Sequence, residues 1–298
     1  MTPWRLVLPS LVVLTLAGCS DETDPSTAAG GSGPLPTTFG GERPVELFVP
    51  PDYDPAVPAP LVILLHGYSV GGALQELLFR LRPLAEQHGA LYAYPDGTVD
   101  EGGKRFWNAT DACCDFYDTD VDDSGYLRGL VEEIQGAYNV DPKRIALTGH
   151  SNGGFMSYRM ACDHSDWVAA IAGLAGAMFD NPVDCGASEP VHVLHIHGTA
   201  DDSVPYEGAS GDRNHPGAVE SVEYWAAHNG CSPTPAAGTP LDLESGLEGD
   251  ETTVTRYEDC DPGGSAELWT IEEGAHLPAL GPDFRVQLME FLLSHPKP

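Results

Sequence analysis

Basic residues are scarce in this chain of 298 residues. Lys and Arg together number 14, against 45 Asp and Glu, so the formal net charge at pH 7 is −31. A field of this sign repels phosphate backbones, and nucleic acid is therefore not expected as a partner. An acidic surface also favours solubility at high ionic strength, where salt screens the repulsion between carboxylates. Neutral ligands fit this charge better than polyanions do.

The chain also lacks an apolar run long enough to cross a bilayer as a mature helix. The run at residues 6–16 follows the positive charge of Arg5 and is too short for that purpose, so it reads as an export signal. It ends in small residues before Cys19, which resembles the site where bacterial lipoproteins are cleaved and lipidated. We predict a signal peptide at residues 1–18 and a lipid anchor on Cys19, with an ordinary signal peptide as the alternative. Ser20 is compatible with passage to an outer membrane; in a cell with one membrane, the anchor would hold the protein on the outer face.

No internal repeat divides the remainder, and its composition separates a tether from a domain. Residues 19–38 are rich in Ser, Thr, Gly, Pro and acid, with too little apolar content to order themselves, and they are predicted to form a flexible tether. Residues 39–298 supply enough apolar material for one large core. We therefore expect a single, monomeric folded domain.

No Cys-x-x-Cys spacing occurs, so the cysteines give no sign of a zinc site, and no metal is expected. Apart from Cys19, six cysteines remain in this exported chain, which favours disulfides: Cys113, Cys114, Cys162, Cys185, Cys231 and Cys260. The first two are adjacent and cannot easily pair with each other, so each is expected to reach one of the next two. The last two are expected to pair. Sequence alone leaves all 15 connectivities of six cysteines open.

Buried strands alternate with helices along the domain. The continuous apolar run Leu61–Leu65 is typical of a strand that is buried on both faces of a parallel sheet. Other strands are expected at 45–49, 91–94, 144–148, 168–174, 191–196, near 254 and at 268–271. Helices are expected at 74–87, from Asp122 or Asp123 to Tyr138, from about 155 to Cys162, and at 218–228 and 282–294. This alternation predicts an α/β fold with a mostly parallel sheet, helices on both faces, and functional groups at the carboxyl ends of the strands.

A serine lies at the end of one such strand. The sequence Gly149-His150-Ser151-Asn152-Gly153 follows the predicted strand 144–148 and precedes a helix, as in the nucleophile elbow of α/β-hydrolases. The flanking glycines remove side chains that would clash in a tight strand-to-helix turn. The helix N-terminus also offers free N–H groups to an oxyanion, and the N–H of Asn152 is the first candidate donor.

A second oxyanion donor is expected from the loop that follows the strand Leu61–Leu65. His66 and Gly67 begin that loop, Gly67 permits close backbone approach, and the N–H of Tyr68 is the best candidate. A plain strand-ending turn is the alternative interpretation of the His-Gly pair.

A hydroxyl nucleophile needs a base and an acid, and in α/β-hydrolases the acid and then the base follow the serine along the chain. Asp201 and Asp202 come just after the predicted strand 191–196, on the same edge of the sheet as Ser151. We choose Asp201 as the acid, with Asp202 as the fallback. A solvated acidic turn is the alternative.

The base is assigned to His276, which lies past the last strand and before the final helix. The other candidates are His215, His228 and His295, which are expected to be surface residues because they lie before or within a helix or at the tail. His195 and His197 lie too close to Asp201 along the chain for either to serve as the base. His195 is expected to be a core or strand residue.

These segments together resemble a known family. The chain is similar to the exported esterases grouped as polyhydroxybutyrate depolymerase-like and feruloyl esterase-like enzymes of the first carbohydrate-esterase family. The likeness covers almost the whole mature domain and rests on 64–67, Trp107-Asn108-Ala109 before Cys113-Cys114, 121–123, 149–154, 197–201 with 204–206, and 229–231. The resemblance implies a triad of Ser151, Asp201 and His276, an acyl-enzyme mechanism, and no cofactor.

Two departures from the family pattern shape the expected substrate. Ala275 replaces the second glycine of the usual Gly-Gly-His loop, so the rim of the site is expected to differ. Family members that degrade solid polyester carry a linker and a polymer-binding domain, whereas this chain ends at Pro298. Soluble feruloyl or acetyl esters of plant polysaccharide, or short hydroxyalkanoate oligomers, are therefore the expected substrates. A peptidase of the same fold and a non-catalytic binding protein are the rival interpretations.

Overall fold

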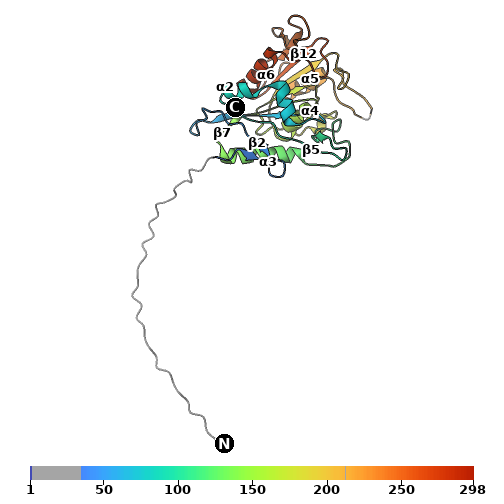
Figure 1. The fold of residues 1–298 in the computed structure, drawn as a ribbon. Coiled ribbons are helices and arrows are strands. Elements are labelled where there is room, and N and C mark those ends of the chain that lie inside the picture. The colour runs from blue at the N-terminus through green and yellow to red at the C-terminus, as the bar shows by residue number, and fades with distance from the viewer. Residues whose placement is uncertain (2–34, 212) are drawn as a thin grey trace. The chain divides into compact units, whose positions relative to one another are not determined.

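The computed structural model describes Met1 and residues 35–211 and 213–298 (Figure 1). The predicted signal peptide, the lipid anchor at Cys19 and most of the predicted tether lie outside the described residues. Residues Leu35–Pro298 form one compact unit. Within the described ranges, no helix is long and apolar enough to cross a membrane.

An eight-stranded sheet forms the centre of this unit, in the order β10-β11-β12-β9-β8-β7-β3-β4. From β12 to β4 all neighbours are parallel, and β10 and β11 extend the sheet in the antiparallel sense. The bounds are β3 (Ala59–Leu65), β4 (Leu91–Ala93), β7 (Val140–His150), β8 (Ala170–Leu174), β9 (His192–Gly198), β10 (Ala236–Ala237), β11 (Thr252–Tyr257) and β12 (Ser265–Ile271). The predicted mostly parallel sheet is confirmed.

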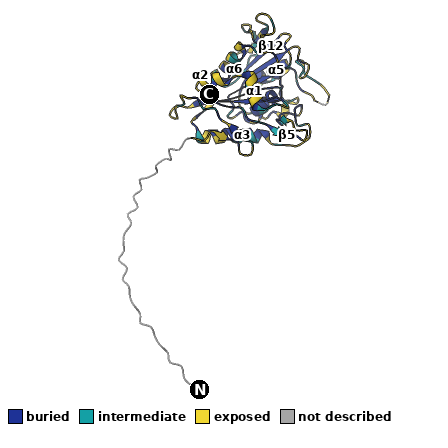
Figure 2. Cartoon of the chain, viewed as in Figure 1, coloured by how far each residue is buried: buried dark blue, intermediate teal, exposed yellow. Residues whose placement is uncertain are grey.

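Helices cover both faces of the sheet. They are α1 (Gly72–Phe79), α2 (Arg82–Gln87), α3 (Asp123–Ala137), α4 (Asn152–Asp163), α5 (Ala218–His228) and α6 (Pro282–Ser294), with a short 3-10 turn at Pro182–Asp184. Alternate residues of β3 enter two separate cores: Ile63 packs with residues of α3, α4 and α5, and Leu64 with residues of α1, α2 and α6. Both side chains are fully buried, and Figure 2 shows the strands as the buried layer between partly exposed helices. Two-stranded ribbons, β1 (Thr38–Phe39) with β2 (Val45–Glu46) and β5 (Thr98–Val99) with β6 (Arg105–Phe106), lie outside the main sheet.

The single helix predicted at 74–87 is wrong, because the chain breaks between α1 and α2. Arg80 ends α1 in the left-handed region, with φ 54°. Pro83 lies in the first turn of α2, where its missing N–H is tolerated, whereas in the interior of one continuous helix it would remove a hydrogen bond. The carboxylate of Glu76 accepts the N–H groups of Leu81 (3.2 Å) and Arg82 (3.1 Å) and so joins the two helices.

Three disulfides join the cysteines of the described residues: Cys113–Cys114, Cys162–Cys185 and Cys231–Cys260. The predicted pairing of the last two is confirmed. The expectation that the adjacent cysteines each reach a distant partner is wrong, because they bond to each other. That expectation assumed a trans peptide, in which consecutive Cα atoms lie about 3.8 Å apart. The peptide between Cys113 and Cys114 is cis, and their Cα atoms are 3.0 Å apart.

Candidate active site

The sequence-predicted site residues all follow parallel strands of the sheet. His66 follows β3, Ser151 follows β7 and Asp201 follows β9, and His276 lies in the loop after β12. Because parallel strands point the same way, their carboxyl ends meet at one edge. Four segments that are far apart in sequence are therefore brought to the same edge.

Ser151 occupies a tight turn between β7 and α4. Its backbone has φ 54° and ψ −119°, a positive φ that a residue with a side chain seldom adopts. Its N–H donates to the carbonyl of Leu174 at 2.8 Å, which holds the turn against the end of β8. A Cβ at Gly149 would overlap Gly153, and one at Gly153 would overlap the carbonyl of Leu65. This geometry is that of a nucleophile elbow.

Asp201 is the carboxylate that faces the predicted base. Its Oδ2 lies 2.8 Å from Nδ1 of His276, and its Oδ1 accepts the N–H groups of Ser203 (2.9 Å) and Val204 (2.8 Å). Burial raises the pKa of Asp201, but its polar contacts with His197, His276 and Val204 outweigh burial and hold the pKa well below its ordinary value. Asp201 is buried and ionised, whereas the fallback residue, Asp202, is exposed.

His150, inside the elbow, holds the loop that carries His276. The two rings lie 4.8 Å apart, and Nε2 of His150 is 2.8 Å from the backbone carbonyl of His276, to which it donates. Burial and the neighbouring His276 lower the pKa of His150 to about 4. A neutral His150 therefore ties the elbow to the loop that carries His276. The sequence pattern gave no sign of this role.

Ser151 and His276 line one cavity of about 660 Å³. Its other lining residues are Tyr68, Ala112, Cys113, Cys114, Phe116, Phe155, Ser203, Val204, Pro205, Ala209, Arg213 and His215. Among the described residues, no hydrogen bond joins the Ser151 hydroxyl to the His276 ring. In many hydrolases this bond is long without substrate and tightens only in the complex.

Aromatic side chains form one wall of this cavity. Tyr68 and Phe116 meet edge to face at 5.1 Å, and the guanidinium of Arg213 lies 4.1 Å from the Phe116 ring centre. The Tyr68 hydroxyl donates to Asp100 at 2.8 Å, and burial together with that carboxylate raises the pKa of Tyr68 to about 12. The phenol is therefore a fixed neutral donor.

His215 is buried beside the cavity, so the expectation that it is a surface residue is wrong. It is 6% exposed, and its ring packs against Phe155 with ring centres 5.8 Å apart. Paired backbone hydrogen bonds between Ala209 and His215, at 3.1 and 3.2 Å, join two residues that both line the cavity. Nothing in the local sequence indicates that pairing.

Two backbone N–H groups lie near Ser151 without a partner among the described residues. Asn152 is the first residue of α4, so its N–H has no carbonyl one turn earlier. The N–H of Tyr68 donates to no described group. A Cβ built on Gly67 would lie 3.5 Å from Cβ of Ser151, which brings the Tyr68 loop against the serine.

His66 and the side chain of Asn152 fix the backbone around these donors. Nδ1 of His66 donates to the carbonyl of Gly67 at 2.8 Å, and Nε2 accepts the N–H of Gly97 at 2.8 Å. The Asn152 amide accepts the Trp107 N–H (2.7 Å) and donates to the Trp107 carbonyl (2.8 Å). These bonds leave the backbone N–H of Asn152 uninvolved.

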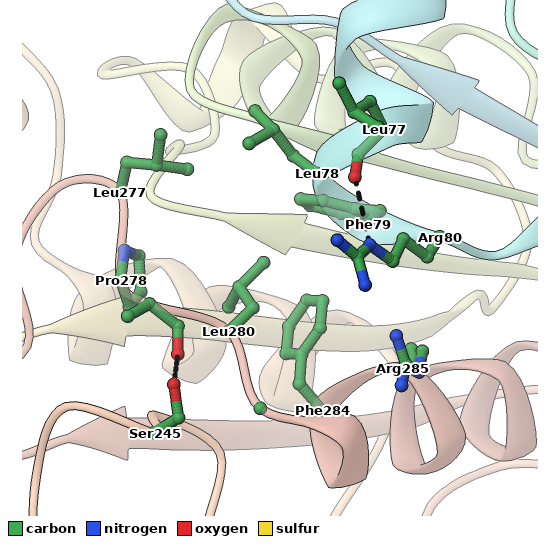
Figure 3. A pocket seen from close by; sticks show the side chains of 12 residues that line it. Leu77, Leu78, Phe79, Arg80, Ser245, Leu277, Pro278, Leu280, Phe284 and Arg285 are labelled. Carbon is green, nitrogen blue, oxygen red and sulfur yellow. Dashed lines mark hydrogen bonds between the residues drawn. The ribbon is translucent and has the colours of Figure 1, made fainter.

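A second cavity, of about 480 Å³, lies between α1 and the start of α6 (Figure 3). Leu77, Leu280 and Phe284 form much of its surface, with Arg80 and Arg285 at one side. Its described lining holds no Asp, Glu, His or Cys, so it offers no acid or base. The described residues also hold no cluster of His, Cys, Asp and Glu suited to a metal ion.

The sheet order and the turn at Ser151 define the α/β-hydrolase fold. The acetyl xylan esterase from Aspergillus awamori has this architecture with a TM-score of 0.60, at 17% sequence identity, over 84% of this chain and 94% of that one. At this identity the likeness concerns the fold alone.

The chain belongs to the esterase family whose model is described as "Putative esterase", which it matches over residues 37–203. It is 36% identical over 161 residues to "Putative esterase NocK" from Nocardia uniformis subsp. tsuyamanensis, covering 52% of this chain and 44% of that protein. It is 32% identical over 227 residues to feruloyl esterase B from Piromyces equi, covering 73% and 39%. The chain thus spans less than half the length of these two relatives.

Proposed function

We propose that this protein is a serine carboxylic ester hydrolase with Ser151 as nucleophile, His276 as base and Asp201 as the acid behind it. The observation that carries the proposal is the strained turn at Ser151, which faces the same cavity as the ring of His276, with Asp201 2.8 Å behind that ring. The ionised Asp201 holds the His276 proton on Nδ1, which leaves Nε2 free to accept the serine proton.

The reaction proceeds through an acyl-enzyme. Ser151 attacks the ester carbonyl while His276 takes its proton, and the N–H groups of Tyr68 and Asn152 stabilise the oxyanion. His276 then returns the proton to the leaving alcohol. Water, activated by the same histidine, releases the acid. No step needs a metal or an organic cofactor.

The cavity favours an aromatic acyl group. Its volume of about 660 Å³ and its aromatic wall suit a hydroxycinnamoyl group, whereas an acetyl group would leave most of the space unfilled. Feruloyl esterase B from Piromyces equi is among the relatives. Feruloyl esters of plant polysaccharide are therefore the first choice, acetyl esters the second, and short hydroxyalkanoate oligomers the third.

Export and lipid anchoring at Cys19 belong to the same proposal. The disulfides support an oxidising compartment. Incorporation of labelled palmitate into the full chain, lost in Cys19→Ala, tests the anchor; unchanged incorporation in the variant would refute it.

Fluorophosphonate labelling tests the nucleophile and separates an enzyme from a binding protein. Ser151→Ala is expected to abolish labelling and to lower kcat for methyl ferulate by about 10⁴-fold or more. Ser203→Ala is the matched control, because Ser203 lines the same cavity yet contacts Asp201 through its backbone N–H alone. Full labelling of the Ser151 variant would overturn the assignment.

A substrate panel then ranks the acyl groups. It compares methyl ferulate, acetylated xylan, short p-nitrophenyl esters, hydroxybutyrate oligomers and a peptide amide. The highest kcat/KM is expected for methyl ferulate. Faster cleavage of the peptide would favour the peptidase alternative.

A further inference from the structure

A row of buried polar side chains runs behind the carboxylate of Asp201. Tyr158 of α4 and His195 and His197 of β9 are 0, 0 and 1% exposed. The Tyr158 hydroxyl lies 2.7 Å from Nδ1 of His195, whose Nε2 lies 2.9 Å from Nδ1 of His197. Nε2 of His197 ends the row, 2.8 Å from the carbonyl of Val204 and 3.2 Å from Oδ2 of Asp201.

The carbonyl at the end of the row fixes the direction of every bond in it. A carbonyl oxygen only accepts, so Nε2 of His197 carries a hydrogen. In a neutral His197 ring, Nδ1 then accepts from Nε2–H of His195, and Nδ1 of His195 accepts from the Tyr158 hydroxyl. Burial lowers the pKa of His195 well below its ordinary value, which keeps that ring neutral. Each of these ring nitrogens is then satisfied.

The row ends at the loop whose backbone binds the carboxylate of Asp201. Val204 donates its N–H to Oδ1 of Asp201 at 2.8 Å and accepts from His197 through its carbonyl. The polar edge of His197 therefore restrains the residue that orients the carboxylate. Val204 also lines the cavity that holds Ser151.

We propose that His197 is a positioning residue for the triad acid, and that His195 and Tyr158 hold it in the Nε2–H tautomer. The inference rests on the proposed function, which makes Asp201 that acid. His197 is not among the residues that line the cavity of Ser151. It fixes the position of the Asp201 carboxylate relative to the ring of His276.

The charged and titratable groups around the row are few. His197 faces Asp201, His195 and the Tyr206 ring, whose centre is 5.6 Å away, and His215 lies near enough to His195 to act on it electrostatically. His276 faces Asp201 and His150. Tests of pH dependence must therefore separate His197 from these neighbours.

Nitrogen-15 NMR of the histidine rings in the full chain tests the tautomers without using activity. At pH 7, His195 and His197 are both expected to be neutral, with the proton on Nε2. A proton on Nδ1 of His197, or on both of its nitrogens, would overturn the proposal. If the tautomers are as expected while Ser151→Ala keeps full activity, the proposed function fails separately.

Kinetics of two His197 variants test the positioning role. His197→Leu removes the donor and is expected to lower kcat by about 100-fold with KM nearly unchanged, the scale at which a small misplacement affects catalysis. His197→Gln keeps an N–H at a comparable reach and is expected to recover most of that loss. Equal losses in both variants, or a rise in KM alone, would indicate packing only and overturn the proposal.

The pH profile is a second readout of the same variants. In His197→Leu the carboxylate of Asp201 loses a nearby N–H dipole, so it stabilises a protonated His276 more strongly. The acidic limb of kcat/KM is therefore expected to move to higher pH, and an unmoved limb would contradict the proposal. His192→Asn is the control: His192 is a buried histidine of the same strand outside the row, so its profile should stay in place.

Tyr158→Phe covers the case in which His197→Leu does not fold. It removes one hydroxyl and keeps the ring that packs in the core. Nδ1 of His195 then loses its hydrogen-bond donor, so its nitrogen-15 signal is expected to move toward that of an unbonded ring nitrogen, while the proton stays on Nε2. An unchanged Nδ1 signal would show that the tyrosine hydroxyl does not hold the row and would overturn the proposal.

Discussion

Gly153 lies where the first turn of α4 passes the end of β3. Gly153→Ala is expected to lower the free energy of unfolding by more than about 2 kcal/mol, because a Cβ there overlaps the carbonyl of Leu65 and the backbone has to move. The proposed esterase activity should fall with it, since the same turn holds Ser151. Urea denaturation and the rate on a p-nitrophenyl ester measure the two effects.

Gly129 provides the matched control. It lies inside α3, and a Cβ built on it meets nothing within 4 Å. Gly129→Ala is therefore expected to stabilise the protein by about 0.5–1 kcal/mol, the usual gain for alanine over glycine in a helix. Equal losses in both variants would refute the close approach at Gly153.

At the residue scale, the sequence predicted those site residues whose positions depend on a local pattern. Asp201 follows a buried strand, and its pairing with His276 was expected from chain order. His215 and Arg213 reach the cavity from a loop in which the backbones of Ala209 and His215 pair, and no pattern in the sequence indicated that pairing. The bond between the adjacent cysteines was missed because it depends on the peptide conformation between them.

At the scale of elements, α3 begins at a side-chain cap. Oδ1 of Asp122 accepts the N–H of Gly125 at 2.7 Å. Asp122→Ala is expected to lower the free energy of unfolding by about 1 kcal/mol, whereas Asp122→Asn keeps the acceptor and should cost only a few tenths. Thermal denaturation of both variants measures the difference, and equal losses would mean that charge, rather than capping, is what matters.

The elements that sequence analysis predicted well are those with strong patterns. The run that became β3 is apolar throughout, and the bounds predicted for α3 and α6 match the observed ones within about a residue. The break between α1 and α2 was missed because apolar spacing continues through Arg80, although Pro83 in the sequence is typical of the first turn of a new helix. Short ribbons such as β5 with β6 have too few residues to show the alternation of apolar and polar residues that predicts a strand.

At the scale of the whole molecule, the protonation of carboxylates and of buried histidines changes the stability of the fold in opposite directions. With a net charge of −31, protonation of carboxylates relieves repulsion as the pH falls. Buried histidines lower the stability as the pH falls, because burial disfavours their protonated form. Burial and the neighbouring His295 lower the pKa of His192 to about 4, from an ordinary value of 6.5. Any single pH curve of stability therefore mixes both effects.

A comparison of the wild type with His192→Asn isolates the histidine, because the carboxylates are common to both chains. Above pH 6.5 His192 is neutral in the folded and unfolded states, and its contribution to stability is complete. Between 6.5 and about 4 only the unfolded chain takes up the proton, so that contribution falls by about 1.4 kcal/mol for each pH unit. Asn does not titrate. The destabilisation caused by His192→Asn, measured by urea denaturation, should therefore shrink steadily from pH 6.5 to 4, and a constant difference would show that His192 is not held neutral by the fold.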